Sequence, residues 1–233
     1  MGNRRMKRRP EHFLRQLDFF SPDRYSPRVT VVGAGGIGSW LVLALSKLGL
    51  RKITVYDADR VERHNLPTTP YLPRSLGALK VHALKALVAP FGTAVQAKPT
   101  RYRRQKLRCE VLISAVDSMD TRRVLFREAG RQKIPFFIDG RIGGENLRVY
   151  AIQPRRRKDR ATYQATLVPN YMIDPLPCTA QQVVDVGFVT AGLMVRAFRQ
   201  WVAQGIYNPE VVVKQDLLSV FVAPGIKEKR RKK

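Results

Sequence analysis

The chain has 233 residues, 44% of them hydrophobic, which is enough to enclose one large core. Its 43 lysines and arginines against 18 acidic residues give a net charge of +25, which predicts attraction to nucleic acid, anionic lipid or acidic protein. Two cysteines are too few for a disulfide framework or a four-thiolate zinc site, and no apolar run is long enough to cross a bilayer. We therefore expect a cytoplasmic protein with no membrane partner.

The basic residues are concentrated in runs that fall at 4–9, 101–108, 155–160 and 227–233. The first run predicts a disordered basic arm over residues 1–10, and the last predicts a basic tail over 227–233. Between them we expect a single domain over residues 11–226. A short helix is expected at its start, over 11–20, before Ser21 and Pro22 break the pattern.

A glycine-rich loop follows the first predicted strand. Val29 to Val32 is a run of β-branched residues, typical of a buried parallel strand, and residues 39–50 have helical spacing. Between them lie Gly33, Gly35, Gly36 and Gly38. Glycine lets the backbone approach a phosphate, and a helix N-terminus offers unpaired N–H groups. The loop therefore predicts a nucleotide site, and it fits a dinucleotide and ATP equally well.

The rest of the chain alternates between strand and helix patterns. Strands are expected at 52–56, 94–98, 111–116, 135–138 and 147–152, helices at 77–88, 120–130 and 179–202, a basic loop-rich segment at 154–177, and a late hairpin at 210–222. This order predicts an α/β fold: a Rossmann-like, doubly wound, mostly parallel sheet with a C-terminal apolar helix and late strands.

Three carboxylates, Asp57, Asp117 and Asp139, follow predicted parallel strands, at the sheet edge where ligands bind in such folds. Asp57 lies 19 residues after Gly38, where an acidic side chain can accept both ribose hydroxyl protons. Asp117, as a second carboxylate, suggests a magnesium ion, and the alternative is that it caps the following helix. Lys80 and Asn65 could reach phosphates from neighbouring elements.

The ordered motifs G-A-G-G-I-G-S, V-Y-D-A-D, N-L, G-A-L-K and S-A-V-D-S-M-D-T-R resemble those of the ThiF/MoeB adenylating enzymes. Ubiquitin-activating enzymes share that nucleotide-binding domain, and the resemblance covers about residues 11–202. It implies that ATP and magnesium are the cofactors. It also implies that a carboxylate, usually the C-terminal glycine of a ubiquitin-like or sulfur-carrier protein, attacks the α-phosphate, so that an acyl-adenylate forms and pyrophosphate leaves.

The resemblance also implies roles for single residues. The loop from Gly33 to Ser39 would hold the phosphates, Asp57 with Asp59 beside it would bind the ribose, Asn65 and Lys80 would contact the phosphates, and Asp117 would hold magnesium. Arg15, in an N-terminal arginine-glutamine pair, would reach the ATP of a partner subunit, which implies a homodimer. Cys178, in a proline-bracketed loop, is a candidate nucleophile toward the adenylate, or a packing cysteine.

The chain departs from the family pattern at two points. Thr68 stands where a phosphate-binding arginine is usual, and the zinc-binding cysteine pairs of many relatives are missing, so we predict no zinc. Cys109 enters an apolar strand and is predicted to be a core residue.

Three other functions compete with activation of a carrier protein. A tRNA threonylcarbamoyl-adenosine dehydratase is suggested by the net charge and by G-S-W at residues 38–40, which would make tRNA a partner through the basic patches. A nucleotide-binding protein without catalysis is suggested by Thr68. An NAD oxidoreductase is least favoured, because it would need neither Asp117 nor Lys80.

Overall fold

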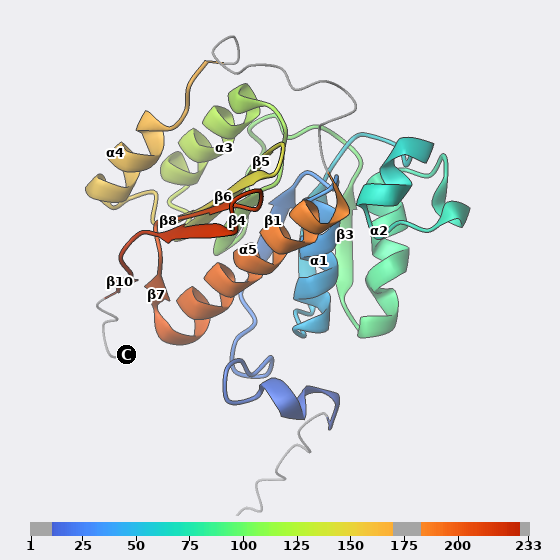
Figure 1. The fold of residues 1–233 in the computed structure, drawn as a ribbon. Helices are drawn as coiled ribbons and strands as arrows, with labels where there is room; N and C mark the ends of the chain where they lie inside the picture. The colour runs from blue at the N-terminus through green and yellow to red at the C-terminus, as the bar shows by residue number, and fades with distance from the viewer. Residues whose placement is uncertain (1–10, 170–182, 229–233) are drawn as a thin grey trace, which may run out of the picture.

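An eight-stranded sheet, in the order β3-β2-β1-β4-β5-β6-β8-β9, forms the centre of the molecule (Figure 1). The computed structural model describes residues 11–169 and 183–228. The strands are β1 (Val29–Val32), β2 (Lys52–Tyr56), β3 (Ala94–Lys98), β4 (Val111–Ser114), β5 (Phe136–Gly143), β6 (Asn146–Ile152), β8 (Glu210–Lys214) and β9 (Ser219–Val222). A second, two-stranded sheet pairs β7 (Ile206–Tyr207) with β10 (Ile226–Lys227).

Five α-helices accompany the sheet: α1 (Gly38–Lys47), α2 (Lys80–Val88), α3 (Met119–Arg131), α4 (Arg157–Ala165) and α5 (Val184–Gln204). Short 3-10 turns are η1 (Glu11–Gln16), η2 (Arg63–Thr68), η3 (Pro73–Ser75) and η4 (Ala89–Phe91). Helices α1, α2 and α5 cover one face of the sheet, and α3 and α4 cover the other (Figure 1).

The strand directions define where a ligand can bind. Strands β1 to β5 are parallel, and beyond β5 each of the strands β6, β8 and β9 is antiparallel to the strand before it in the sheet. The chain moves outward from β1 to β2 and β3, then crosses back to β4 on the other side of β1. The order therefore reverses between β1 and β4, which makes the carboxyl ends of these two strands the topological switch point of the sheet.

The buried strands explain the sequence pattern. All four residues of β1 are buried, with Val29 and Val31 packed on the α1, α2 and α5 side and Val32 on the α3 side. A strand covered on both faces needs no polar alternation, so it appears as a continuous β-branched run. The predicted α/β, doubly wound, mostly parallel fold is confirmed, including the apolar helix α5 and the late β8–β9 hairpin.

Two predictions in the second half of the chain are corrected. The strand expected at 135–138 is present, but it continues as β5 to Gly143 and forms a hairpin with β6. The segment expected to be loop-rich, 154–177, contains the helix α4, and its residues 170–177 lie outside the described ones. Helix α4 buries only Asp159 and Tyr163, at i and i+4, and two buried residues give too weak a hydrophobic period to recognise in a strongly basic sequence. The N-terminal helix is also shorter than expected, since only η1 forms there.

The far edge of the sheet is apolar and exposed. Leu218, Val220 and Phe221, in and beside β9, have 91%, 62% and 59% of their surface exposed.

Across residues 11–169 and 183–228, helices that combine the length and the hydropathy needed to span a bilayer are absent.

Cys109 packs in the core on the α3 side of the sheet, as predicted, with 9% of its surface exposed. Burial raises the pKa of its thiol to about 11, partly offset by a hydrogen bond with Thr30. The sulfur is therefore a protonated thiol at neutral pH, and only the thiolate is a strong nucleophile.

We expect Cys109 to resist alkylation in the folded protein. In a Cys178→Ala variant Cys109 is the only cysteine left, so its reaction with a maleimide can be followed alone. Labelling should be at least about 100-fold slower in buffer than in denaturant, because the thiolate forms only when the core opens. Equal rates in the two conditions would contradict this burial.

Candidate nucleotide-binding site

The glycine loop lies at the switch point, pressed against the backbone that follows β4. Gly33 has φ of +98°, and its N–H donates to the carbonyl of Tyr56 at 2.9 Å. A Cβ on Gly33 would lie 2.2 Å from the carbonyl oxygen of Ala115, and one on Gly38 would lie 1.9 Å from that of Gly33. Both glycines are therefore required by backbone packing. Gly35 differs, because a Cβ there would meet nothing within 4 Å.

The first turn of α1 opens from this loop. The hydroxyl of Ser39 donates to the carbonyl of Gly35 at 2.6 Å, and Ser39 is buried. This hydrogen bond holds the backbone of the loop against the first turn of α1. Gly36 lies in the turn between Gly35 and Ser39. The first turn of α1 has no acidic residue to satisfy its N–H groups. The partial positive charge of a helix N-terminus therefore faces the loop, as an anion site requires.

Asp57 is held by the loop and by the residue that follows its own strand. Its Oδ2 accepts from the N–H of Ala34 at 2.7 Å, and its Oδ1 accepts from the N–H of Asp59 at 2.8 Å. Burial raises the pKa of the Asp57 carboxyl above its ordinary value, and the two N–H donors oppose that shift. Each oxygen keeps a further lone pair, so the group can still accept hydrogen bonds from a ligand.

Lys80 begins α2 and points back to the end of β2. Its Nζ lies 3.2 Å from Oδ2 of Asp59, and its side chain is only 11% exposed. The hydroxyl of Tyr71 lies 2.8 Å from the carbonyl of Ala34 and 3.3 Å from that of Lys80. No sequence motif marks Tyr71, yet this single side chain connects the glycine loop to the start of α2. Burial raises its pKa far above the ordinary value, so the hydroxyl remains a donor.

Asn65 organises η2 beside the loop. Its side-chain oxygen accepts from the N–H of Glu62 at 3.0 Å, in a reciprocal cap of the 3-10 turn. In the same turn, the carbonyl of Thr68 accepts from the indole of Trp40 at 3.0 Å, and that ring packs edge-on against Phe188 of α5. The Thr68 region is therefore anchored to α1 through its backbone.

Asp117 lies two residues beyond Ala115, at the same edge of the sheet, and is exposed. The N-cap of α3 is Ser118, whose hydroxyl accepts from the N–H of Thr121 at 3.4 Å, so the alternative of Asp117 as the helix cap is wrong. The carbonyl of Asp117 accepts from Nη1 of Arg122 at 3.1 Å. That bond fixes the backbone and leaves the carboxylate facing outward.

The sequence predicted Asp139 at the end of a strand, and that prediction is wrong. Asp139 lies within β5, paired in register with Ser114, and is fully buried. Its oxygens accept from Arg122 Nε at 3.1 Å, Arg141 Nε at 2.7 Å and the Tyr163 hydroxyl at 2.9 Å. Burial first, and then Asp139, raise the pKa of Tyr163 well above its ordinary value, which keeps this donor protonated. Asp139 is therefore a structural anion with two cationic partners.

A magnesium ion at this edge of the sheet would need ligands from the nucleotide as well as from the protein. Within the described ranges, 11–169 and 183–228, there is no group of three or more His, Cys, Asp or Glu side chains that could hold a metal ion. Magnesium is commonly bound by one or two carboxylates together with substrate phosphates and waters. The exposed carboxylate of Asp117 fits a magnesium ion held chiefly by the phosphates of a nucleotide.

Of the two remaining predicted residues, only Arg15 is described, and it lies far from this edge. Arg15 is exposed on η1, and the neighbouring Gln16 donates to the carbonyl of Leu48, just beyond the last residue of α1. The ten residues of α1, about 15 Å, separate that position from the loop. Cys178 lies outside the described residues.

A glycine loop, a half-buried carboxylate and a lysine that meet at the switch point of a doubly wound sheet define a nucleotide-binding α/β protein. A model of the ThiF family matches residues 23–210, and the chain belongs to that family.

Curated relatives share the family. The SAMP-activating enzyme E1 of Haloferax volcanii is 32% identical over 108 residues, which cover 43% of this chain and 40% of that protein. The tRNA threonylcarbamoyladenosine dehydratase of Escherichia coli is 28% identical over 137 residues, 50% of this chain and 47% of that protein. The chain thus spans less than half the length of these two relatives.

Solved structures share the fold. Escherichia coli MccB in complex with MccA-N7isoASN superposes with a TM-score of 0.75 at 14% identity, over 91% of this chain and 72% of that one. PaaA superposes with a TM-score of 0.73 at 14% identity, over 95% and 76%.

We expect Gly33→Ala and Gly35→Ala to differ in stability, although both add one methyl group to the same loop. The first forces a Cβ into the carbonyl of Ala115 at a left-handed φ, which should lower the free energy of unfolding by about 3 kcal/mol. Gly35→Ala is the matched control, since its Cβ enters open space. Thermal unfolding would measure both, and equal melting temperatures would contradict the close approach.

Proposed function

We propose that this protein is an ATP-dependent adenylyltransferase that activates the C-terminal carboxylate of a ubiquitin-like or sulfur-carrier protein. The observation that carries this proposal is the meeting of the glycine loop, Asp57, Lys80 and the exposed carboxylate of Asp117 at one edge of the sheet. An NAD oxidoreductase would need only the loop and Asp57. The family of the chain and the relatives named as E1-like activating enzymes support the same assignment.

In the proposed reaction, a carboxylate oxygen of the carrier forms a bond to the α-phosphorus of ATP. The bond from that phosphorus to the bridging oxygen breaks, which gives an acyl-adenylate and pyrophosphate. The loop from Gly33 to Ser39 holds the phosphates through the N–H groups of residues 35–38 at the N-terminus of α1, because those of Gly33, Ala34 and Ser39 already donate within the protein. Asp57 accepts from the ribose hydroxyls. Lys80, released from Asp59 by a competing phosphate, and the side-chain amide of Asn65 add donors where negative charge accumulates.

Asp117 would hold magnesium against the phosphates, where the ion supplies charge neutralisation to the departing pyrophosphate. Arg122 then acts as a positioning residue, because its bond to the Asp117 carbonyl fixes the direction of that carboxylate.

We further propose that the active form is a homodimer. Arg15 is separated from the glycine loop of its own chain by the length of α1, so only a second copy could bring this guanidinium to ATP. In the same N-terminal segment, Leu14 has 56% and Phe19 has 63% of its surface exposed. A subunit interface could cover this apolar surface. In the proposed dimer Arg15 neutralises charge on the partner's ATP.

Cys178 is proposed to act after adenylation. A thiolate can attack the acyl carbon of the adenylate and release AMP, which gives a thioester with the carrier. It contributes nothing to formation of the adenylate itself.

A second candidate substrate is the carboxylate on a threonylcarbamoyl-adenosine of tRNA. The net charge of +25 favours it, and so do two relatives named as tRNA threonylcarbamoyladenosine dehydratases, one of which, from Saccharomyces cerevisiae, is 42% identical over 65 residues.

Exchange of labelled pyrophosphate into ATP separates these substrates. We expect exchange only when ATP, magnesium and the correct carboxylate are present, so candidate carrier proteins and modified tRNA are added one at a time. Absence of exchange with all of them, together with tight binding of NAD and none of ATP in calorimetry, would contradict adenylation.

Two substitutions should separate the two chemical steps. Asp117→Ala should lower pyrophosphate exchange by about 100-fold or more, because metal placement carries several kcal/mol of the barrier. Asp216→Ala, which removes an exposed carboxylate in the remote β8–β9 turn, is the control and should exchange normally. Cys178→Ala should keep the exchange and lose any thiol-sensitive adduct with the carrier. Normal exchange in Asp117→Ala would show that the metal role is wrong, and an adduct that persists in Cys178→Ala would place the nucleophile elsewhere.

A further inference from the structure

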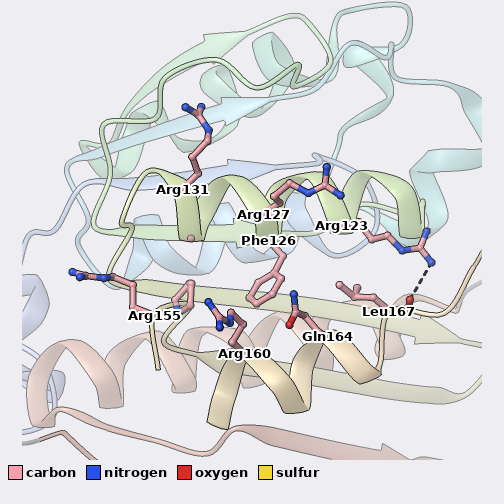
Figure 2. Close-up of a pocket in the computed structure, with 10 residues that line it drawn as sticks. Arg123, Phe126, Arg127, Arg131, Arg155, Arg160, Gln164 and Leu167 are labelled. Atoms are coloured by element: carbon pink, nitrogen blue, oxygen red, sulfur yellow. Dashed lines mark hydrogen bonds between the residues drawn. The ribbon is translucent and has the colours of Figure 1, made fainter. Parts of the chain in front are cut away.

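A basic cleft lies between α3 and α4, on the face of the sheet opposite α1, α2 and α5 (Figure 2). Its volume is about 600 Å³, within the usual range for ligand sites. Five of the residues that line it are arginines: Arg123, Arg127, Arg131, Arg155 and Arg160. We call it the arginine cleft. Nothing in the proposed adenylation reaction uses it.

The two walls of the arginine cleft come from different parts of the sequence. Arg123, Arg127 and Arg131 recur every four residues on α3, so they lie along one side of that helix at intervals of about 6 Å. Arg155 lies just before α4 and Arg160 lies within it. Phe126 points between the helices and forms part of the apolar floor (Figure 2).

The positive charge of the arginine cleft is poorly neutralised. Among the described residues that line it there is no aspartate or glutamate. Arg123 pairs with Asp120 and Arg131 with Glu128, but Arg127, Arg155 and Arg160 have no ion-pair partner within the described part of the chain. The nearest acidic residue of α4, Asp159, is buried, and its oxygens accept from Tyr207, Arg156 and the Gln153 N–H.

One wall is also fixed in position before any ligand binds. Arg123 donates through Nη2 to the carbonyl of Leu167 at 3.0 Å, across the cleft from α3 to the segment that follows α4 (Figure 2). Its Nη1 lies 2.6 Å from Asp120. These bonds set the width of the cleft near the N-terminal end of α3.

The basic surface continues beyond the C-terminal end of α3. Gln132 accepts from the N–H of Leu107 at 2.7 Å and donates to the carbonyl of Gln105 at 3.2 Å. These bonds hold the basic segment 101–108, with its exposed Arg103, Arg104 and Arg108, against the end of the helix. The result is a cationic band longer than the cleft, which fits an extended polyanion better than a single small anion.

We propose that the arginine cleft binds the sugar–phosphate backbone of a nucleic-acid strand. Guanidinium groups bind phosphate oxygens through paired hydrogen bonds, and their spacing along α3 lets one strand meet several of them in succession. The shared ligand is the phosphodiester backbone, whether it comes from RNA or DNA. This inference does not depend on adenylation, because the cleft and the glycine loop use different residues.

The test measures binding of a fluorescent single-stranded oligonucleotide of about 15 nucleotides by anisotropy at several salt concentrations. One arm uses RNA and one uses DNA of the same sequence, which identifies the source of the backbone. Arg127→Glu with Arg160→Glu should weaken binding at least about 10-fold and reduce the slope of log K against log salt by about 1.4, the value for two lost phosphate contacts on a single strand. Both side chains are exposed, so the fold should remain, and Arg127→Gln with Arg160→Gln is the milder variant if it does not.

The matched control is Lys52→Glu with Lys85→Glu, which lowers the net charge by the same amount at two exposed residues on other elements, β2 and α2. It should bind within about twofold of the wild type, because screening confines the effect of remote charges. Equal loss in the two double variants would overturn the proposal, as would no binding by the wild type at low salt. Competition by poly-glutamate as strong as competition by the unlabelled strand would overturn it in favour of an acidic protein partner.

Discussion

The loop after β1 and the chain after β4 approach each other so closely that the loop has no space for a Cβ at Gly33. Gly33 contacts the carbonyl of Ala115, and Gly38 contacts Gly33 in turn. This approach brings Asp57, which follows β2, and Asp117, which follows β4, to opposite sides of the same loop. The glycines therefore act twice, first by letting two crossover connections meet and then by leaving backbone N–H groups uncovered for a phosphate.

Behind that edge, the buried anion of Asp139 holds the chain segments that carry the outer residues. Arg122 connects it to the carbonyl of Asp117, and Arg141 connects it to Thr166 after α4. Loss of either arginine would leave Asp139 without one of its two compensating charges, which is expensive in a fully buried position. The same network therefore supports both the nucleotide edge of the sheet and the α4 wall of the arginine cleft.

The sequence predicted those elements whose residue types follow directly from their surroundings in the fold. The β-branched strands β1 and β2 and the glycine loop lie within a residue or two of their predicted positions, because most residues of these strands are buried and that environment favours such residue types. Asp139 was misplaced, since an aspartate after four apolar residues has the same pattern at a strand end and inside a strand paired to charged partners. Tyr71 was missed because its role depends on two carbonyls, of Ala34 and Lys80, that no sequence pattern brings together.

The charge of the protein is distributed in a way that separates its two candidate anion sites. At the glycine loop, the nearby cation Lys80 is almost buried and already paired with Asp59, so attraction of phosphate there depends mainly on backbone N–H groups. Between α3 and α4, attraction depends on full charges that water and salt can screen. Binding of a nucleotide alone would need few of the 43 basic residues. The proposed nucleic-acid strand in the arginine cleft would account for part of the charge that the nucleotide leaves unexplained.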